Sequence, residues 1–331
     1  MNAVSTHAGP ETAADVTDLA RRALDHWGVR GGEPVLLKYR ENAVFRIHLL
    51  DGRPAVMRVH RLGYHTDAAL RGELQWMGFL QAAGVATPSP IATQAGDPFV
   101  LVGTSALTQP RQVDCLSWLE GRAVGARGVP LDHTPEQLEQ VFREIGRCIA
   151  HMHNVTATWS PPSGFTRHAW DLDGFFGAAP IWGRFETSPF LDGARRELVF
   201  RAREKAVKAL SEHEHSARNF GIIHADLVRE NVLIHDGAVR IIDFDDCGFG
   251  WHMYDLAVAL YQNRDEPLDG YRQQRELTAQ DIAALPLFAA LRAFAFLGWV
   301  QSRVEGDITR EVGLRMSNIA ADVIAAYLRD K

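Results

Sequence analysis

Asp226, Asn231 and Asp243 each stand at the end of a short apolar run of the chain. The three runs are rich in Ile, Val and Leu, and they predict buried strands at 221–223, 232–234 and 239–242. Carboxylates at the ends of strands do not stabilise a hydrophobic core, because burying an unpaired charge costs free energy. We therefore expect these side chains to be compensated by something other than the core.

The segment between Asn231 and Asp243 predicts a hairpin with His235-Asp236-Gly237 at its turn. Such a hairpin brings Asn231 and Asp243 to the same edge, where an amide oxygen and a carboxylate make a site suited to Mg²⁺. Asp226 is then left to accept a proton from an attacking hydroxyl group. A metal that bridges phosphates and a separate carboxylate that orients the nucleophile are the groups that phosphoryl transfer needs.

The order of these residues resembles the motifs of the protein-kinase-like superfamily. The pattern is His224-Ala225-Asp226, followed by Asn231 and then by Asp243-Phe244-Asp245. The His-Ala-Asp form and the later block Tyr254-Asp255-Leu256-Ala257 are similar to the aminoglycoside phosphotransferase and choline kinase-like branch, the phosphotransferase enzyme family. The resemblance covers almost the entire chain and implies ATP- and Mg²⁺-dependent phosphorylation of a hydroxyl group.

The resemblance also implies roles for single residues. Asp226 is expected to be the catalytic base of a loop at 224–231, and Asp243, in a metal motif at 243–245, is expected to hold Mg²⁺ together with Asn231. Asp255 matches a structural aspartate of the family.

The polar neighbours of these residues leave several alternatives open. His224 is expected to hydrogen-bond loop backbone rather than to carry a proton. Asp245 is expected to join the metal site or to contact the substrate. Asp246 is expected either to contact the substrate or to cap the following turn.

The first part of the chain predicts a small antiparallel sheet. An amphipathic helix over about 16–27 is followed by strands, and Asp51-Gly52 is a strong hairpin signal between two of them. The expected elements are strands at 35–38, 44–50, 55–60, 97–105 and 112–121, with a helix at 67–82 between the third and fourth strands.

The rest of the chain predicts mainly helices. Thr134-Pro135-Glu136-Gln137 is a capping-box start, and the apolar residues that follow form one helical face. Further helices are expected at 193–213 and from 278 to the end, with an irregular segment at 160–192. The predicted fold is α+β, bilobal and protein-kinase-like, with a small antiparallel β N-lobe and a larger mainly α C-lobe. The predicted bounds are 1–116 for the N-lobe, 117–121 for a hinge and 122–331 for the C-lobe.

The resemblance places ATP-binding groups in the N-lobe. The basic residue expected on the third strand is Arg58, with Glu73 of the following helix as its partner, although the family usually has Lys there. Arg can still bind phosphate in a bidentate manner. A plain surface ion pair is the alternative for Arg58 and Glu73. The loop Tyr39–Ala43 contains no Gly and offers Asn42 as a phosphate contact. Adenine is expected at the backbone near the hinge, at Cys115, Ser117 and Leu119.

Composition limits the class of protein. The chain has 331 residues, 46% of them hydrophobic, and its net charge of −6 gives no electrostatic reason to expect nucleic acid as a partner. Three scattered cysteines favour a reducing cytosol. No signal peptide is visible, and the most apolar stretch, 287–300, contains Arg292 and is too short to cross a bilayer. We therefore expect a cytoplasmic protein with no membrane partner, of undetermined oligomeric state.

Two histidine-containing segments and a group of aromatic residues have competing interpretations. Glu212-His213-Glu214-His215 is expected to be a solvated helix end rather than a metal site, since alternate residues of a helix point apart. His151 and His153 are expected to favour the macrodipole at a helix end. Trp170, Phe175, Phe176 and Trp182 either line an acceptor pocket or pack the large lobe.

The acceptor is expected to be a small molecule, because Asp243 and Asp255 lie too close in the chain for a long regulatory activation loop. Resemblance to homoserine, hydroxylysine and choline kinases implies an amino alcohol or a hydroxy amino acid, and an aminoglycoside is also possible. Asp245, Asp246 and Asp255 would suit an ammonium group, and Arg292 would bind a carboxylate or form an internal salt bridge. The alternatives are a Ser/Thr protein kinase resembling stress-response kinase A and a nucleotide-binding pseudokinase scaffold.

Overall fold

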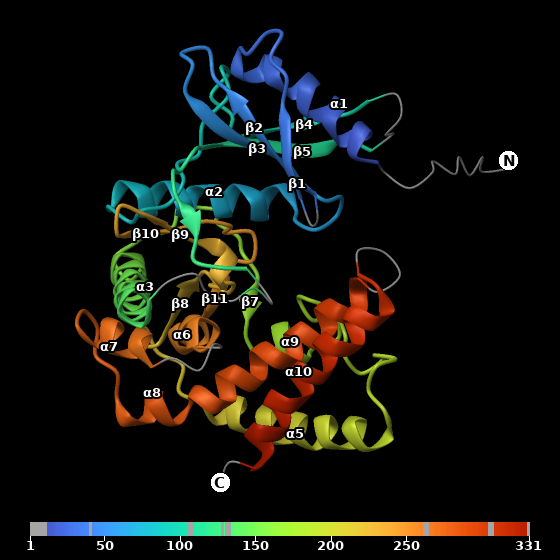
Figure 1. The fold of residues 1–331 in the computed structure, drawn as a ribbon, viewed down its shortest axis with the longest axis vertical. Coiled ribbons are helices and arrows are strands. Elements are labelled where there is room, and N and C mark those ends of the chain that lie inside the picture. Colours follow the sequence, from blue (N-terminus) through green and yellow to red (C-terminus); the bar gives the residue numbers. More distant parts are fainter. Residues whose placement is uncertain are drawn as a thin grey trace, which may run out of the picture. The chain divides into compact units, whose positions relative to one another are not determined.

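The computed structural model describes residues 12–39, 42–104, 109–126, 129, 134–260, 265–303 and 308–329. The chain forms two compact units, each with its own elements (Figure 1). The first unit contains residues 1–82, 87–120 and 161–166, and the second contains 83–86, 121–160 and 167–331. One boundary between the units follows Glu120, within the segment predicted as a hinge, whereas the assignment of 161–166 to the first unit was not predicted.

The first unit is built on a five-stranded antiparallel sheet of order β1-β2-β3-β5-β4. Its strands are β1 Val35–Tyr39, β2 Ala43–His48, β3 Pro54–Val59, β4 Phe99–Val102 and β5 Arg111–Ser117. Helix α1 (Ala13–Ala23) continues as the 3₁₀ turn η1 (Leu24–Trp27), and their apolar residues form one core with those of β2, β3 and β5. Helix α2 (Asp67–Ala82) lies between β3 and β4 in the chain. These elements agree closely with the predicted ones.

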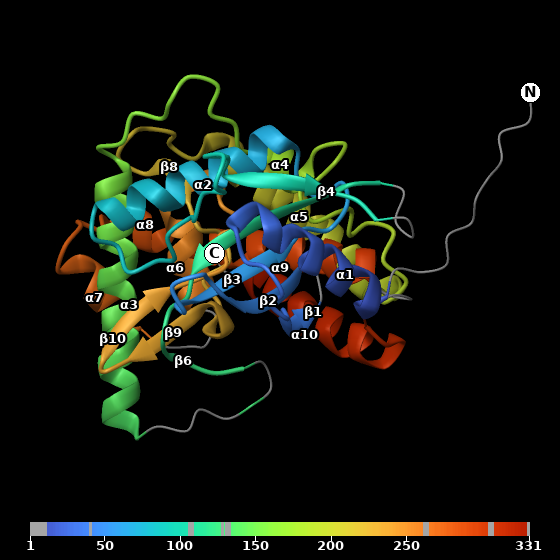
Figure 2. The same ribbon diagram turned by 90° about the horizontal axis from the view of Figure 1, so that it is seen from above.

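The second unit contains eight of the helices in the described part of the chain, and two small sheets. The helices are α3 Pro135–Thr156, α4 Leu172–Phe176, α5 Gly193–Glu212, α6 His252–Leu260, α7 Glu266–Arg272, α8 Ala279–Ala283, α9 Leu285–Arg303 and α10 Arg310–Arg329. One sheet has the order β10-β9-β6, formed by β10 Ala238–Ile241, β9 Val232–His235 and β6 Arg122–Ala123 (Figure 2). The other has the order β7-β11-β8, formed by β7 Ala169–Trp170, β11 Gly248–Trp251 and β8 Phe220–Ile223. Short strands β6, β7 and β11 and helices α4, α6 and α7 were not predicted from the sequence.

Close helix packing in the second unit depends on two glycines. A Cβ atom at Gly146 of α3 would lie 1.9 Å from the Pro267 carbonyl oxygen, and one at Gly270 of α7 would lie 1.8 Å from that of Arg143. Any larger residue would therefore push α3 and α7 apart. The capping box at Thr134 that was predicted to start α3 is confirmed.

Helix α9 is the most apolar long helix of the second unit. It is longer than the predicted apolar stretch 287–300 and, alone among the described helices, has the length and composition to cross a membrane, so the prediction that it is too short is wrong. Nevertheless, 67% of its apolar window is buried in the protein. It packs against α10 and α6, which agrees with the buried helix that the sequence predicts. Gly298 of α9 allows a tight contact, because a Cβ there would lie 2.1 Å from the Gly183 carbonyl oxygen.

Candidate active site

The β9–β10 hairpin places Asn231 and Asp243 at the same end, as the sequence predicts. Ile242 donates its N–H to the Asn231 carbonyl oxygen at 3.0 Å, which continues the ladder to the residue before Asp243. At the other end, Asp236 and Gly237 have φ angles of 48° and 78° and form a two-residue turn. Left-handed backbone at both central positions matches the right-handed twist of the strands.

The carboxylate of Asp226 is held at both oxygens. Asn231 donates from Nδ2 to Oδ2 of Asp226 at 2.9 Å and to its carbonyl oxygen at 3.0 Å. Arg292 of α9 forms an ion pair with Oδ1. The Asp226 side chain remains 20% exposed to solvent.

His224 has a structural role in the loop, as expected. Its Nδ1 accepts the N–H of Asp226 at 3.2 Å, so the proton of the neutral ring is on Nε2, which donates to the Ile242 carbonyl oxygen at 3.0 Å. Its ring also packs against Phe244, with 4.6 Å between the centroids. His224 therefore joins the Asp226 loop to the segment that carries Asp243.

Asp255 of α6 anchors the same loop and is the structural aspartate that the resemblance implies. Its two oxygens accept the N–H groups of His224 at 3.0 Å and Ala225 at 2.7 Å. The side chain is fully buried, and this burial raises the pKa of Asp255 to about 6, against the opposing effect of His224 and the two amides. Asp255 is consequently not available to bind an ammonium substrate, and that prediction is wrong.

Two residues of the site have left-handed backbone without being glycine. Ala225, which precedes Asp226, has φ of 67°, and Asp243 has φ of 68°. Such conformations cost free energy and persist only where the surroundings enforce them. At Ala225 the hydrogen bond from its N–H to Asp255 does so.

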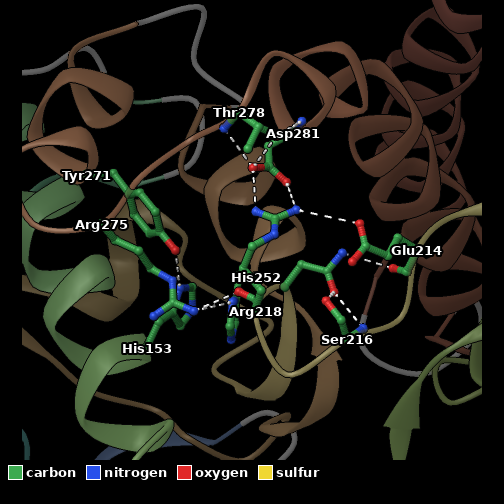
Figure 3. Close-up of polar contacts among 10 residues, drawn as sticks. His153, Glu214, Ser216, Arg218, His252, Tyr271, Arg275, Thr278 and Asp281 are labelled. Carbon is green, nitrogen blue, oxygen red and sulfur yellow. Dashed lines mark hydrogen bonds and ion pairs between the residues drawn. The ribbon is translucent and has the colours of Figure 1, made fainter.

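A buried hydrogen-bond chain extends from Asp255 to α7 and was not predicted. His153 of α3 lies 3.0 Å from the Tyr271 hydroxyl through Nδ1 (Figure 3). Its Nε2 lies 3.1 Å from Oδ2 of Asp255. Its ring stacks on that of His252, with 4.3 Å between the centroids. Burial and nearby Arg275 hold the pKa of His153 well below its usual range, so the ring is neutral. Tyr271 therefore donates to His153, and His153 donates to Asp255.

The prediction that His153 favours the helix macrodipole is wrong for this reason. A charge–dipole effect needs an imidazolium ion, whereas the His153 side chain is fully buried and neutral. The spacing of His153 and Asp255 in the chain gave no signal of their contact, because it depends on how α3 and α6 pack.

The histidine pair after α5 packs against aromatic rings. Helix α5 ends at Glu212, as expected. The ring centroid of His213 lies 5.3 Å from that of Phe288 and 6.0 Å from that of Trp251, and the ring of His215 lies 3.9 Å from that of Phe220. These contacts favour the interpretation as a helix end over that as a metal site.

An ion pair fixes the same segment to α8 (Figure 3). Arg218 binds both carboxylate oxygens of Asp281, at 2.9 and 3.2 Å. Asp281 also accepts from the backbone and hydroxyl of Thr278 in a capping box. The segment that leads into β8, and so into the Asp226 loop, is thereby held to the helices.

The residues after Asp243 are anchored by indole groups. The carboxylate of Asp246 accepts from Nε1 of Trp182 at 2.8 Å, and its carbonyl oxygen accepts from Nε1 of Trp170 at 2.9 Å. The carbonyl oxygen of Asp245 accepts from Arg167 at 2.5 Å. Asp246 is thus bound to tryptophan side chains, and none of these contacts is the turn cap that was one of its predicted roles.

The aromatic residues with two possible roles form packed core. Trp170 is fully buried and stacks on Tyr254, with 5.5 Å between the centroids. Phe175 and Phe176 are also buried, and Trp182 lies edge-on to Trp170. Packing of the second unit is therefore their main role.

Arg292 forms the internal salt bridge that was one of its two predicted roles. It pairs with Asp226, and its guanidinium carbon lies 4.3 Å from the ring centroid of Trp182. Burial disfavours its charge, but Asp226 and Tyr254 outweigh this effect and raise the pKa of Arg292. The guanidinium is therefore charged, and its partner is the predicted catalytic base.

In the first unit, Arg58 and Glu73 form the predicted pair at 2.8 Å. Both side chains are buried, so the alternative of a surface ion pair is wrong. Asp114 of β5, opposite Arg58 in the register, binds its Nε and Nη2 at 2.9 and 2.6 Å, and His60 lies 2.8 Å from the same carboxylate. Burial opposes ionisation of Asp114, but Arg58 and His60 outweigh this effect and lower its pKa. Sequence reasoning missed Asp114, and its position within an apolar strand was the available signal.

The remaining predicted nucleotide contacts lie in the first unit and have backbone partners there. The Asn42 side chain accepts the N–H of Arg61 at 3.1 Å, whereas Arg40 and Glu41 of the same predicted loop lie outside the described residues. The role of Asn42 at a phosphate stays a prediction.

At the end of β5, the backbone groups that were predicted to bind adenine form hydrogen bonds within the first unit. The Cys115 carbonyl oxygen accepts from Ile91 at 2.8 Å, and the Ser117 N–H donates to Ser89 at 2.8 Å. Leu119 follows the strand and is half-buried. The roles of Cys115, Ser117 and Leu119 at a nucleotide stay predictions.

The donor set at the hairpin end fits a hard divalent cation. The amide nitrogen of Asn231 is committed to Asp226, so the amide oxygen is the group that can face a metal. Asp243 adds a carboxylate at the same end of the hairpin. An amide oxygen and a carboxylate, with waters or phosphate oxygens completing the shell, suit Mg²⁺.

Known structures and sequences resemble this chain along most of its length. A microcompartment-associated aminopropanol kinase is 29% identical, with a TM-score of 0.81 over 94% of this chain and 96% of that one. A homoserine kinase of Sinorhizobium fredii is 28% identical over 273 residues, which are 77% of this chain and 74% of the relative. Amicoumacin kinase of Bacillus subtilis is 22% identical over 296 residues, 83% of this chain and 82% of the relative. The α+β, bilobal and protein-kinase-like fold class is thereby confirmed.

The family model described as "Phosphotransferase enzyme family" matches residues 35–294. This match begins at β1 and ends within α9, so it includes Arg58, the loop at 224–231, the predicted metal motif at 243–245 and Arg292. The resemblance drawn from the sequence motifs is confirmed, and the chain belongs to the phosphotransferase enzyme family.

Proposed function

We propose that this chain transfers the γ-phosphoryl group of ATP to the hydroxyl group of a small amino alcohol, with Mg²⁺ as the cation. The observation that carries the proposal is the Asp226 carboxylate, fixed at both oxygens beside the hairpin end that presents Asn231 and Asp243. A carboxylate that orients a hydroxyl group and a nearby hard-oxygen metal site are the parts that phosphoryl transfer needs.

Asp226 acts as the base. It accepts the hydrogen bond of the acceptor hydroxyl and then its proton, as the oxygen attacks the γ-phosphorus and ADP leaves. Its carboxylate keeps lone pairs for this bond, since each oxygen has two and Asn231 and Arg292 take one on each. Asn231 and Asp243 would hold Mg²⁺, which when bound neutralises charge on the phosphate oxygens.

The nucleotide is proposed to contact the first unit. Asn42 and Arg58 would bind phosphate oxygens, with Glu73 orienting Arg58, and the backbone near Cys115, Ser117 and Leu119 would meet adenine. Arg58 is already bound by Glu73 at 2.8 Å and by Asp114 at 2.6 Å, so a phosphate oxygen would share its guanidinium with two carboxylates.

An amino alcohol is favoured by charge. Asp246 offers a half-buried carboxylate, oriented by Trp182, for an ammonium group. Arg292, the cation that could have recognised a substrate carboxylate, is committed to Asp226 and to the Ala225 carbonyl oxygen. The likeness to an aminopropanol kinase supports the same acceptor class.

A hydroxy amino acid is the second candidate acceptor. Several homoserine kinases are 27–28% identical to this chain. The two candidates differ by the α-carboxylate, so a comparison of homoserine with aminopropanol separates them.

The test is ADP release by the purified protein with Mg·ATP and a panel of acceptors. The panel holds aminopropanol, ethanolamine, choline, homoserine, hydroxylysine, two aminoglycosides and a Ser/Thr protein substrate. We expect turnover of an amino alcohol, with a loss of about 10³-fold or more in Asp226→Asn. The matched control is Asp236→Asn, in the exposed hairpin turn, which should retain full activity.

Other results would change the conclusion. Preferred turnover of homoserine would favour the second candidate. Tight binding of Mg·ATP without turnover of any acceptor, unchanged in Asp226→Asn, would favour a pseudokinase scaffold. Failure to bind any nucleotide would overturn the proposal.

A further inference from the structure

Arg292 lies within the most apolar long helix of the second unit and points its charge at the predicted base. Only 6% of the residue is exposed. It binds Oδ1 of Asp226 and lies 3.3 Å from the Ala225 carbonyl oxygen through Nη1. A buried guanidinium is costly unless its charge is paired and its N–H groups are bonded.

The surroundings of Arg292 hold it in this position. Its guanidinium carbon lies 4.3 Å from the ring centroid of Trp182, and Trp182 donates from Nε1 to Asp246 at 2.8 Å. The contact of Gly298 with the Gly183 backbone keeps the Trp182 segment close to α9. Arg292 is therefore fixed by a stacked indole as well as by its hydrogen bonds.

Arg292 and Asn231 act on opposite oxygens of one carboxylate. Asn231 binds Oδ2 from the catalytic loop and Arg292 binds Oδ1 from α9. Two donors from different elements fix the plane of the carboxylate, whereas one donor would let it rotate about the bond to Cβ. A base that must meet a hydroxyl group in line with a phosphate benefits from such fixed orientation.

We propose that Arg292 is a positioning residue, which holds the carboxylate of Asp226 in the orientation that receives the acceptor hydroxyl group. This inference rests on the proposed function. On this proposal Arg292 does not distinguish acceptors with a carboxylate from those without one, because its hydrogen bonds are made to the Asp226 loop and not to the substrate.

The test compares Arg292→Lys and Arg292→Ala with a matched control on the same helix, Arg303→Lys. Arg303 is also 6% exposed and also stacks on a tryptophan, with 4.5 Å to the ring centroid of Trp299. Thermal unfolding and Mg·ATP binding are measured first, and Arg292→Lys, which keeps the charge, is the variant expected to fold. Steady-state constants are then measured with aminopropanol and with homoserine.

We expect Arg292→Lys to lower kcat by about 10- to 100-fold, because a single ammonium cannot reproduce the two-point contact. The KM values for ATP and for both acceptors should change less than about threefold, since binding is not what the residue supplies. Methylguanidinium should restore part of the activity of Arg292→Ala, and Arg303→Lys should keep its kcat.

Three results would overturn the inference. These are an unchanged kcat in folded Arg292→Lys, an equal loss in Arg303→Lys, or a rise in KM confined to homoserine, which would make Arg292 a carboxylate-binding residue. Failure of the unaltered protein on every acceptor is a different result, since it would overturn the proposed function and this inference with it.

Discussion

Asp255 sets the position of the loop that carries Asp226 through hydrogen bonds to two consecutive backbone amides. Its environment opposes its own charge, because burial raises its pKa to about 6. The folded protein therefore binds a proton at this residue more tightly than the unfolded chain does. The contribution of Asp255 to the free energy of unfolding is largest below about pH 4 and decreases as the pH rises through 6.

We predict that Asp255→Asn removes this dependence on pH. Between pH 4 and pH 7 the free energy of unfolding of the unaltered protein should fall, relative to that of the variant, by about 2 kcal/mol, since each pKa unit corresponds to about 1.4 kcal/mol and the unfolded carboxyl is already partly ionised at pH 4. Urea denaturation at half-unit pH steps measures both curves. Parallel curves would show that Asp255 titrates alike in the folded and unfolded states.

At the scale of elements, the crossing of α3 and α7 positions His153 and Tyr271 to support Asp255. The two helices approach so closely because Gly146 faces the backbone of Pro267 and Gly270 faces that of Arg143. The hydrogen-bond chain to Asp255 thus depends on residues that make no polar side-chain contact themselves.

We predict that Gly146→Ala lowers the free energy of unfolding by about 1–3 kcal/mol, because its Cβ would lie 1.9 Å from a carbonyl oxygen. Gly193→Ala is the control in the same unit, at the start of α5 with nothing within 4 Å of the added atom, and should change stability by less than about 0.5 kcal/mol. Chemical denaturation measures both. A neutral effect of Gly146→Ala would mean that α3 and α7 can separate at little cost.

At the scale of the whole molecule, binding of Mg·ATP should not depend on Asp226, the proposed catalytic base. We predict that Mg·ATP raises the melting temperature of the unaltered protein and of Asp226→Asn equally, since a ligand at 100 times its Kd adds about 2.7 kcal/mol. Asn231→Ala should need a higher Mg²⁺ concentration for the same shift. Thermal unfolding across a Mg²⁺ titration tests both, and an unaltered Mg²⁺ requirement in Asn231→Ala would remove it from the metal site.

The sequence was sufficient to predict the elements and motifs that depend on local pattern. The β9–β10 hairpin was predicted from two apolar runs separated by turn residues at Asp236-Gly237. The N-lobe strands were predicted from β-rich runs and the turn residues between them. Contacts that depend on packing between distant segments were not predictable in this way. Asp114 opposite Arg58, His153 beneath Asp255 and Arg292 on Asp226 all belong to this second kind.

Arg292 and Asp226 lie 66 residues apart in the chain, on elements that meet only in the folded protein. A recombinant gene with a crossover between them would join the catalytic loop of one relative to the C-terminal helices of another. Such a chimera could retain every motif residue of the loop and lose the arginine that faces it. Libraries built by gene shuffling in this family should therefore keep both segments from the same parent, or restore Arg292 after the exchange.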